Sequence, residues 1–139
     1  METIKSIWFE GGRIYMRSEN GSLYSRPLEA FPRLLEASDE ERSAYEILFG
    51  GRAVRWASVD EDIHVMSFME EGECDYDNEV GRIFRALPEL NVSEVARRMG
   101  IDKSLLARYI YGISRPSGER LAEIKETIRE IGEGILAVV

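Results

Sequence analysis

The chain has 139 residues and a formal net charge of −8, and 44% of its residues are hydrophobic. This composition is typical of a folded globular protein of one or two small domains. No apolar run approaches the roughly 20 residues that a membrane helix needs. The alternating N-terminus, which contains Glu10, does not resemble a secretory signal. We therefore expect a cytoplasmic protein without a membrane partner.

Catalytic and metal-binding patterns are weak. A single cysteine, Cys74, excludes an intramolecular disulfide and a four-cysteine metal site. Residues 60–62 are acidic and His64 follows them, but neighbouring strand residues point to opposite faces and cannot all converge on one ion. No serine or cysteine has the context of an activated nucleophile. The sequence predicts a protein that is not an enzyme and has no metal or cofactor.

The charge is distributed unevenly. Residues 1–76 carry 16 acidic and 8 basic side chains, whereas residues 77–139 carry 10 of each. Within residues 91–116 there are five basic and two acidic side chains. An acidic protein can still bind DNA through such a local basic region, because salt limits the reach of the field to about 8 Å.

The first half is predicted to be rich in β-strands. Alternating segments at 4–10, 13–18 and 22–26 indicate three strands, and Gly11-Gly12 is interpreted as a turn. Asn20-Gly21 predicts a type I′ hairpin turn, in which both residues have positive φ.

Short helical and extended segments follow along the chain. Residues 28–37 predict a helical piece with a break or a new first turn at Pro32, and Ser38 begins a helix whose first turn is acidic. Two further strands flank Gly50-Gly51, and residues 62–69 fit either strand or helix. We expect a β-rich domain at 1–72, a meander of about four to six strands with a small helix.

The hydrophobic period changes after the acidic segment 70–77, which is the best linker candidate. Apolar residues at positions 80, 83, 84 and 87 predict an amphipathic helix that Pro88 ends. A run of short helices then fills the second half. We predict an α+β protein in which an all-α, lambda-repressor-like helix-turn-helix domain occupies residues 77–139.

The stretch VARRMGIDKSLLARYIYG, residues 95–112, predicts two short helices joined by a turn. Asn91 can cap the first helix, and Gly100 can end it in the left-handed conformation. Asp102 can cap the second helix, with Leu106 on its buried side. The polar side chains predicted to point outward near the N-terminus of the second helix are Lys103, Ser104 and Arg108. These residue types can read base edges in the major groove, although a solvated helix face explains them as well.

The segment LNVSEVARRMGIDKSLLARYIYGISRPS resembles the Cro and phage-repressor (XRE-like) helix-turn-helix family. The resemblance implies base contacts from Lys103, Ser104 and Arg108. It implies DNA phosphate contacts near Tyr111 and Arg115, and to this set we add Asn91 and Arg97. The chain departs from the family at Val92, where a phosphate-anchoring glutamine is usual, and at Ile110, where a glutamate is common. The departure at Val92 predicts weaker anchoring on the DNA backbone.

The last helix is predicted over residues 118–132, with Ser117 as its cap and an apolar stripe that includes Ile124 and Ile128. The apolar tail ILAVV follows at 135–139, and a small monomer is not expected to expose it. Residues 1–70 are similar to a small bacterial domain of unknown function (family 2442 of such domains), through the segments PLEAFPRLLEAS and Trp56 to Ile63. That resemblance implies a fold and no chemistry.

The sequence therefore predicts a transcription regulator that binds double-stranded DNA as a homodimer and reads its target through the major groove. A dimer would place two recognition helices about 34 Å apart. Its contact could come from the sheet edge at Trp8 and Phe9 or from the apolar tail. The alternative is an antitoxin-like interaction module whose acidic half binds a basic protein partner, and one protein can combine both roles.

Overall fold

The computed structural model describes residues 2–139 and divides the chain into two compact units, one ending at Cys74 and the other spanning Asp75–Val139. The first unit holds two antiparallel three-stranded sheets, and the second is helical. The predicted α+β class is confirmed, with its β-rich N-terminal part and its C-terminal helices. No helix among residues 2–139 has both the length and the apolar character needed to cross a membrane.

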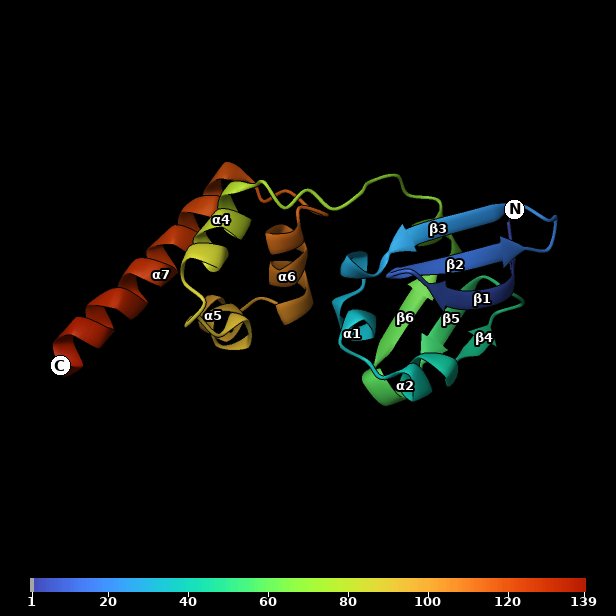
Figure 1. The fold of residues 1–139 in the computed structure, drawn as a ribbon, viewed down its shortest axis with the longest axis horizontal. Helices are drawn as coiled ribbons and strands as arrows, with labels where there is room; N and C mark the ends of the chain where they lie inside the picture. The colour runs from blue at the N-terminus through green and yellow to red at the C-terminus, as the bar shows by residue number, and fades with distance from the viewer. Residues whose placement is uncertain (1) are drawn as a thin grey trace. The chain divides into compact units, whose positions relative to one another are not determined.

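The first sheet has the strand order β1-β2-β3 (Figure 1). Its strands are β1 (Ile4–Glu10), β2 (Arg13–Ser18) and β3 (Leu23–Pro27). The tight turn between β1 and β2 is made by Gly11 (φ 57°) and Gly12 (φ 75°). Glu10 pairs directly with Arg13, so these two glycines supply the left-handed backbone that a two-residue hairpin requires.

The turn between β2 and β3 differs from the prediction. Gly21 has φ 92°, but Asn20 is not among the residues with positive φ, so the type I′ assignment is wrong. The side-chain oxygen of Asn20 instead accepts hydrogen bonds from the Ser18 hydroxyl at 2.5 Å and from the Ser22 amide at 2.9 Å. An asparagine that bonds to the backbone two residues later forms an Asx turn, which holds a longer loop without a second left-handed residue.

Two short helices and a second sheet complete the first unit. Pro32 is the first residue of α1 (Pro32–Leu35), and Ser38 caps α2 (Asp39–Ser43) through a reciprocal capping box with Glu41. The second sheet has the order β4-β5-β6. Its strands are β4 (Glu46–Leu48), β5 (Ala53–Trp56) and β6 (Glu61–His64). The remaining short helices are η1 (Leu28–Ala30), η2 (Ala57–Val59) and α3 (Val65–Phe68). The ambiguous segment 62–69 thus contains both the end of a strand and a helix.

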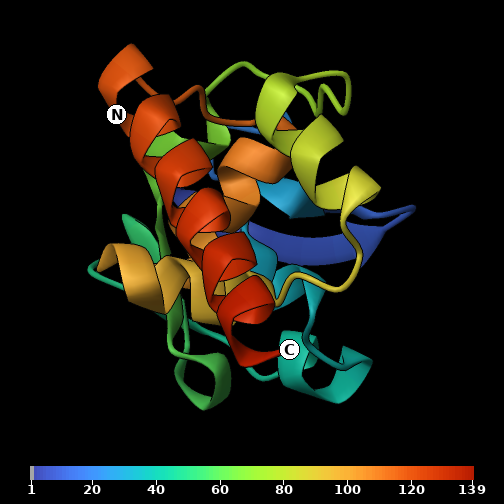
Figure 2. The same ribbon diagram turned by 90° about the vertical axis from the view of Figure 1, so that its left-hand side faces the viewer.

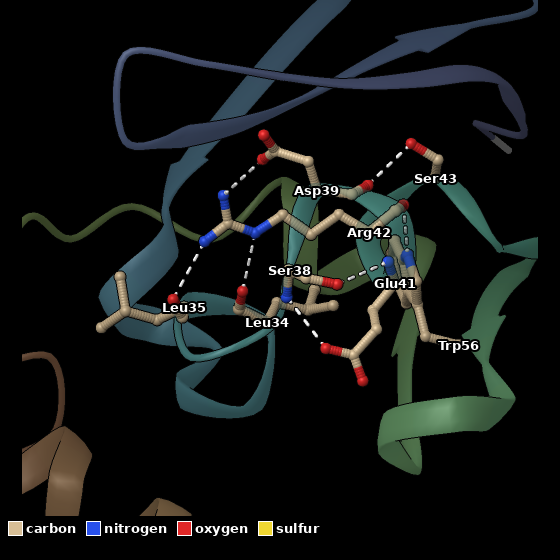
Figure 3. A network of polar contacts seen from close by, with 8 residues as sticks. All are labelled: Leu34, Leu35, Ser38, Asp39, Glu41, Arg42, Ser43 and Trp56. Carbon is tan, nitrogen blue, oxygen red and sulfur yellow. Dashed lines mark hydrogen bonds and ion pairs between the residues drawn. The ribbon is translucent and has the colours of Figure 1, made fainter.

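Arg42 connects α1, α2 and β5 in the first unit (Figure 3). Its guanidinium donates from Nε to the carbonyl oxygen of Leu34 and from Nη2 to that of Leu35, both at 2.9 Å. Its own carbonyl oxygen accepts from the Nε1–H of Trp56 at 2.9 Å. Trp56 is fully buried, so this bond satisfies the one polar group of the largest core side chain.

The second unit is a bundle of four helices around one apolar core (Figure 2). The helices are α4 (Glu79–Ala86), α5 (Val92–Met99), α6 (Lys103–Tyr111) and α7 (Gly118–Val138). The buried core residues are Val80, Phe84, Val95, Ala96, Leu106, Tyr109 and Ile124. The amphipathic helix predicted before Pro88 is therefore α4, and its apolar face packs on this core.

Helix α7 is longer than predicted. It continues through Gly132 and Gly134 to Val138, and Figure 1 shows it as one straight helix whose last turns extend past α5. Each glycine costs a helix interior about 1 kcal/mol relative to alanine, yet neither glycine ends this helix. The helix instead carries its apolar tail into solvent, where 59% of Ile135 and 87% of Val138 are exposed.

Candidate nucleic-acid interface

Helices α5 and α6 form a helix-turn-helix whose ends are set by local hydrogen bonds. The Asn91 side-chain oxygen accepts from the Glu94 amide at 3.2 Å and caps α5. Gly100 ends α5 in the left-handed conformation, with φ 70° and ψ 29°. The Asp102 carboxylate accepts from the Ser104 amide at 2.7 Å and caps α6. The predicted caps and turn are all present, so the sequence of this region folds as its local signals indicate.

The turn between the two helices is held against the core. The backbone amide of Ile101 donates to the carbonyl oxygen of Ala96 at 3.0 Å. The Ile101 side chain packs on the apolar core of the second unit, called the second core below. Ala96 is 1% exposed and Leu106 is fully buried. The small side chain of Ala96 lets α5 and α6 approach closely, which fixes the direction of α6 relative to α5.

The three predicted base-reading residues are presented differently. Lys103, the first residue of α6, is exposed, and Arg108, about one and a half turns later, is half-buried. Ser104 is only 8% exposed. Because residues 104 and 107 lie on neighbouring positions of the helix surface and Ala107 is 7% exposed, this side of α6 is largely covered. Of the three predicted residues, Lys103 and Arg108 are therefore accessible on this helix, whereas Ser104 is largely covered.

The four predicted phosphate-binding residues occupy different parts of the unit. Asn91 and Arg115 are exposed, and Tyr111 is half-buried with its ring edge-on to that of Tyr76 at 6.2 Å. Arg97 is exposed and donates from Nε to the Glu94 carboxylate at 3.0 Å, and this hydrogen bond raises the pKa of Arg97. The structure thus gives Asn91 a capping role and Arg97 an acidic neighbour on its own helix.

An acidic segment bonds to the C-terminal end of α6, which sequence reasoning missed. The backbone amide of Asp75 donates to the carbonyl oxygen of Tyr111 at 3.0 Å. Asn78 caps α4 by accepting from the Gly81 amide, and its Nδ2 donates to the Ile110 carbonyl oxygen at 3.0 Å. The last carbonyl groups of α6 are therefore satisfied by a segment that lies some 35 residues earlier in the chain. No local pattern in either segment could have predicted this pairing.

The two departures from the helix-turn-helix family have a structural use. Val92 and Ile110 are both partly buried and pack against the second core. A glutamine and a glutamate at these positions would place polar groups beside apolar neighbours, whereas valine and isoleucine extend the apolar surface. At these two sites the chain favours packing of the bundle over polar contacts at its surface.

The acidic cluster considered as a metal site in the sequence is used for ion pairs. Arg55 bonds to the carboxylates of Asp60 at 2.8 Å and Asp62 at 2.9 Å. The hydrogen bond from Arg55 holds the pKa of Asp60 below its ordinary value. Within residues 2–139, no group of three or more metal-ligating side chains is arranged to hold an ion.

The fold and the arrangement of α5 and α6 define a two-part protein with a helix-turn-helix domain at its C-terminal end. In agreement with this, residues 82–129 match the model of the family described as "Helix-turn-helix". Residues 4–73, half of the chain, match the model described as "Protein of unknown function (DUF2442)", and the chain belongs to that family. Both resemblances inferred from the sequence are confirmed.

One solved structure is similar to part of the chain. It is a crystal structure of a protein of unknown function from Rhodospirillum rubrum, with 25% sequence identity and a TM-score of 0.44. The similarity covers 50% of this chain and 86% of that one. No curated protein matches the chain.

Proposed function

We propose that the chain is a sequence-specific transcription regulator that binds double-stranded DNA as a homodimer. In this proposal residues 77–139 are the DNA-binding domain, and residues 1–72 form a separate domain. The observation that carries it is an exposed lysine at the start of α6, directly after a capped helix-turn-helix corner. This end of the second helix is the one that meets base edges in helix-turn-helix proteins.

The basic side chains near α6 also support this helix as the one that meets DNA. Residues 91–116 carry five basic and two acidic side chains, in a chain whose net charge is −8. We assign base contacts mainly to Lys103 and Arg108, whose side chains can donate to guanine O6 and N7. Ser104 remains in the proposed set of base-contacting residues, but we expect it to contribute less to base recognition because it is only 8% exposed.

Phosphate contacts are proposed for Arg115, Tyr111, Asn91 and Arg97. Arg115 is exposed in the loop after α6, where a basic side chain can reach the backbone of the same groove. Asn91 keeps its two amide hydrogens for a phosphate while its oxygen caps α5. For Arg97 the ion pair with Glu94 competes with a phosphate, so we expect its contribution to be the smallest of the four.

Selection of bound sequences from a random duplex library tests the proposal. The wild-type chain should enrich a near-palindromic site whose halves lie one helical turn apart. Arg108→Ala should change the preferred base at one position in each half-site and weaken binding by about 1–3 kcal/mol. Arg129→Ala, a change on the exposed part of α7, is the matched control and should select the same site as wild type. Enrichment of no sequence by the wild-type chain would refute sequence-specific recognition.

A second candidate function is an antitoxin-like module that binds a basic protein. It is favoured by the charge of residues 1–76, which carry twice as many acidic as basic side chains, and by the covered side of α6 at Ser104. This function predicts a basic protein that co-purifies with the chain and dissociates as salt is raised, together with no DNA binding at low salt.

A further inference from the structure

Helix α7 carries an apolar seam with the spacing of a coiled coil. The seam residues follow one another at alternating intervals of three and four positions: Leu121, Ile124, Ile128, Ile131, Ile135 and Val138. Alternation of three and four is the a and d pattern of a heptad repeat, which holds one face of a helix toward a single partner over its whole length.

Only the first part of this seam has a partner within the bundle. Ile124 is fully buried, and Ile128 and Ile131 are partly buried against the second core. Farther along, 59% of Ile135 and 87% of Val138 are exposed. Figure 2 shows α7 running across the front of the other helices of its unit toward the end marked C. The same seam therefore leaves the core and continues into solvent.

Two glycines flank the exposed part of the seam. Gly132 follows Ile131 and Gly134 precedes Ile135, so they occupy the e and g positions beside the a and d residues. A Cβ atom added to either glycine would meet nothing within 4 Å. Neither glycine is thus required by packing inside the bundle, although each weakens the helix. Because glycine has no side chain, a second helix can approach the α7 backbone closely at these two positions.

A shallow apolar groove lies at the same place. It is lined by Ile131, Gly134, Ile135 and Val138 of α7, by Val139 directly after it, and by Arg98 of α5. Arg98 is the one charged residue of this lining, so the groove suits an apolar partner better than a strongly charged one.

We propose that the exposed seam of α7 is a self-association surface whose occupant is the same seam of a second copy, packed antiparallel. In an antiparallel pair each a residue faces a d residue. A two-fold axis beside Glu133 then sets Ile131 against the partner's Ile135 and the partner's Ile131 against Ile135. The glycines of both helices meet at the crossing point. This inference deepens the proposed function and rests on its homodimer, for which it names the contact.

The exposed area is compatible with a dimer of modest affinity. Ile135, Val138 and Val139 are 59%, 87% and 96% exposed. Together they present on the order of 400 Å² of apolar surface, within the range of the largest patch of a typical monomer. Two copies would bury about 800 Å², which is the size of a weak or transient interface. We therefore expect a reversible dimer that dissociates in the micromolar range.

Sedimentation equilibrium of the full chain without DNA tests the proposal through three variants. Ile135→Asp lies in the seam and should weaken dimerisation about 100-fold or more, because it buries a charge in an apolar contact. Leu136→Asp is the matched control. Its residue is more exposed and lies one position outside the seam, so it should dimerise within about threefold of wild type. Gly134→Gln should strengthen the helix of the monomer and still weaken the dimer about tenfold.

Cross-linking tests the antiparallel direction in a Cys74→Ser background. A chain with Ile131→Cys and a chain with Ile135→Cys should form a disulfide when mixed, and neither should cross-link efficiently by itself. Efficient cross-linking of Ile135→Cys chains with one another would overturn the antiparallel register.

The proposal is overturned if the wild-type chain is monomeric up to high micromolar concentration. It is equally overturned if Leu136→Asp weakens association as much as Ile135→Asp, or if Gly134→Gln has no effect. Binding of an isolated DNA half-site by Ile135→Asp separates this proposal from the previous one. A monomeric wild-type chain that binds a half-site refutes the seam alone, whereas a seam-dependent dimer that binds no DNA refutes only the DNA-binding function.

Discussion

The carbonyl oxygen of Asp75 lies where a side chain at Gly112 would have to be. A Cβ atom built on Gly112 would be 2.1 Å from that oxygen, and Gly112 has φ 76°. The same glycine ends α6, the proposed recognition helix. Position 112 therefore requires glycine for two reasons. Its backbone is left-handed, and the backbone of Asp75 approaches it too closely for a side chain.

This relationship predicts that Gly112→Ala is unusually destabilising. We expect a loss of about 3 kcal/mol or more in the free energy of unfolding, because the added methyl group collides with backbone that cannot rotate away. Gly100→Ala is the matched control. Gly100 has φ 70°, but a Cβ there would meet nothing within 4 Å, so the cost should be about 1 kcal/mol. Urea unfolding of both variants measures the difference, and equal costs would contradict the role assigned to Asp75.

Arg42→Lys should destabilise the first unit although the charge is retained. Lysine cannot reproduce the two hydrogen bonds that the guanidinium donates to Leu34 and Leu35, and it loses the contact over the Phe9 ring. We expect a loss of about 1–3 kcal/mol, measured by thermal or urea unfolding. Arg52→Lys changes an exposed arginine in the same unit and should be neutral. A neutral result for Arg42→Lys would show that its hydrogen bonds do not hold α1.

The ion pair between Arg13 and Glu73 should make stability depend on pH. Hydrogen bonds from Arg13 to the Glu73 carboxylate, at 2.8 and 2.9 Å, hold the pKa of Glu73 below its ordinary value. A carboxyl group whose pKa is lower in the folded state contributes stability above its unfolded pKa of about 4.3. That contribution is lost as the pH falls through the folded pKa.

Glu73→Gln should therefore be less stable than wild type at pH 7 and equally stable in strong acid. The difference should stay below about 1 kcal/mol, because the Glu73 side chain is 67% exposed and water screens the pair. Urea unfolding across the acidic range measures it. Glu71→Gln removes an exposed carboxylate two residues away and is the matched control. A stability difference that persists unchanged at acidic pH would contradict the assignment.

Local signals in the sequence were sufficient for much of the fold. Asn91, Asp102 and Ser117 were expected as helix caps, and each accepts the hydrogen bond that the cap requires. Gly100 ends α5 as expected. These features depend on atoms a few residues apart, so residue type and spacing determine them.

Features that depend on distant segments were not predicted. The bond between Asp75 and Tyr111 joins positions 36 apart in sequence, and the low exposure of Ser104 follows from tertiary packing of α6. The continuation of α7 through Gly132 shows a further limit, since a single glycine lowers the stability of a helix without necessarily ending it. Outward residues of a helix can therefore be suggested from periodicity, but their exposure is decided by the whole fold.

The most direct test of the central claim is a salt series of binding to duplex DNA, for wild type and for the double variant Lys103→Ala and Arg108→Ala. Wild type should bind at about 50 mM salt, and the logarithm of its affinity should fall linearly with that of the salt concentration. The double variant should bind at least about tenfold more weakly. Arg129→Ala should match wild type. Equal affinities of wild type and the double variant, or an absence of wild-type binding at low salt, would contradict the assignment of α6 as the DNA-reading helix.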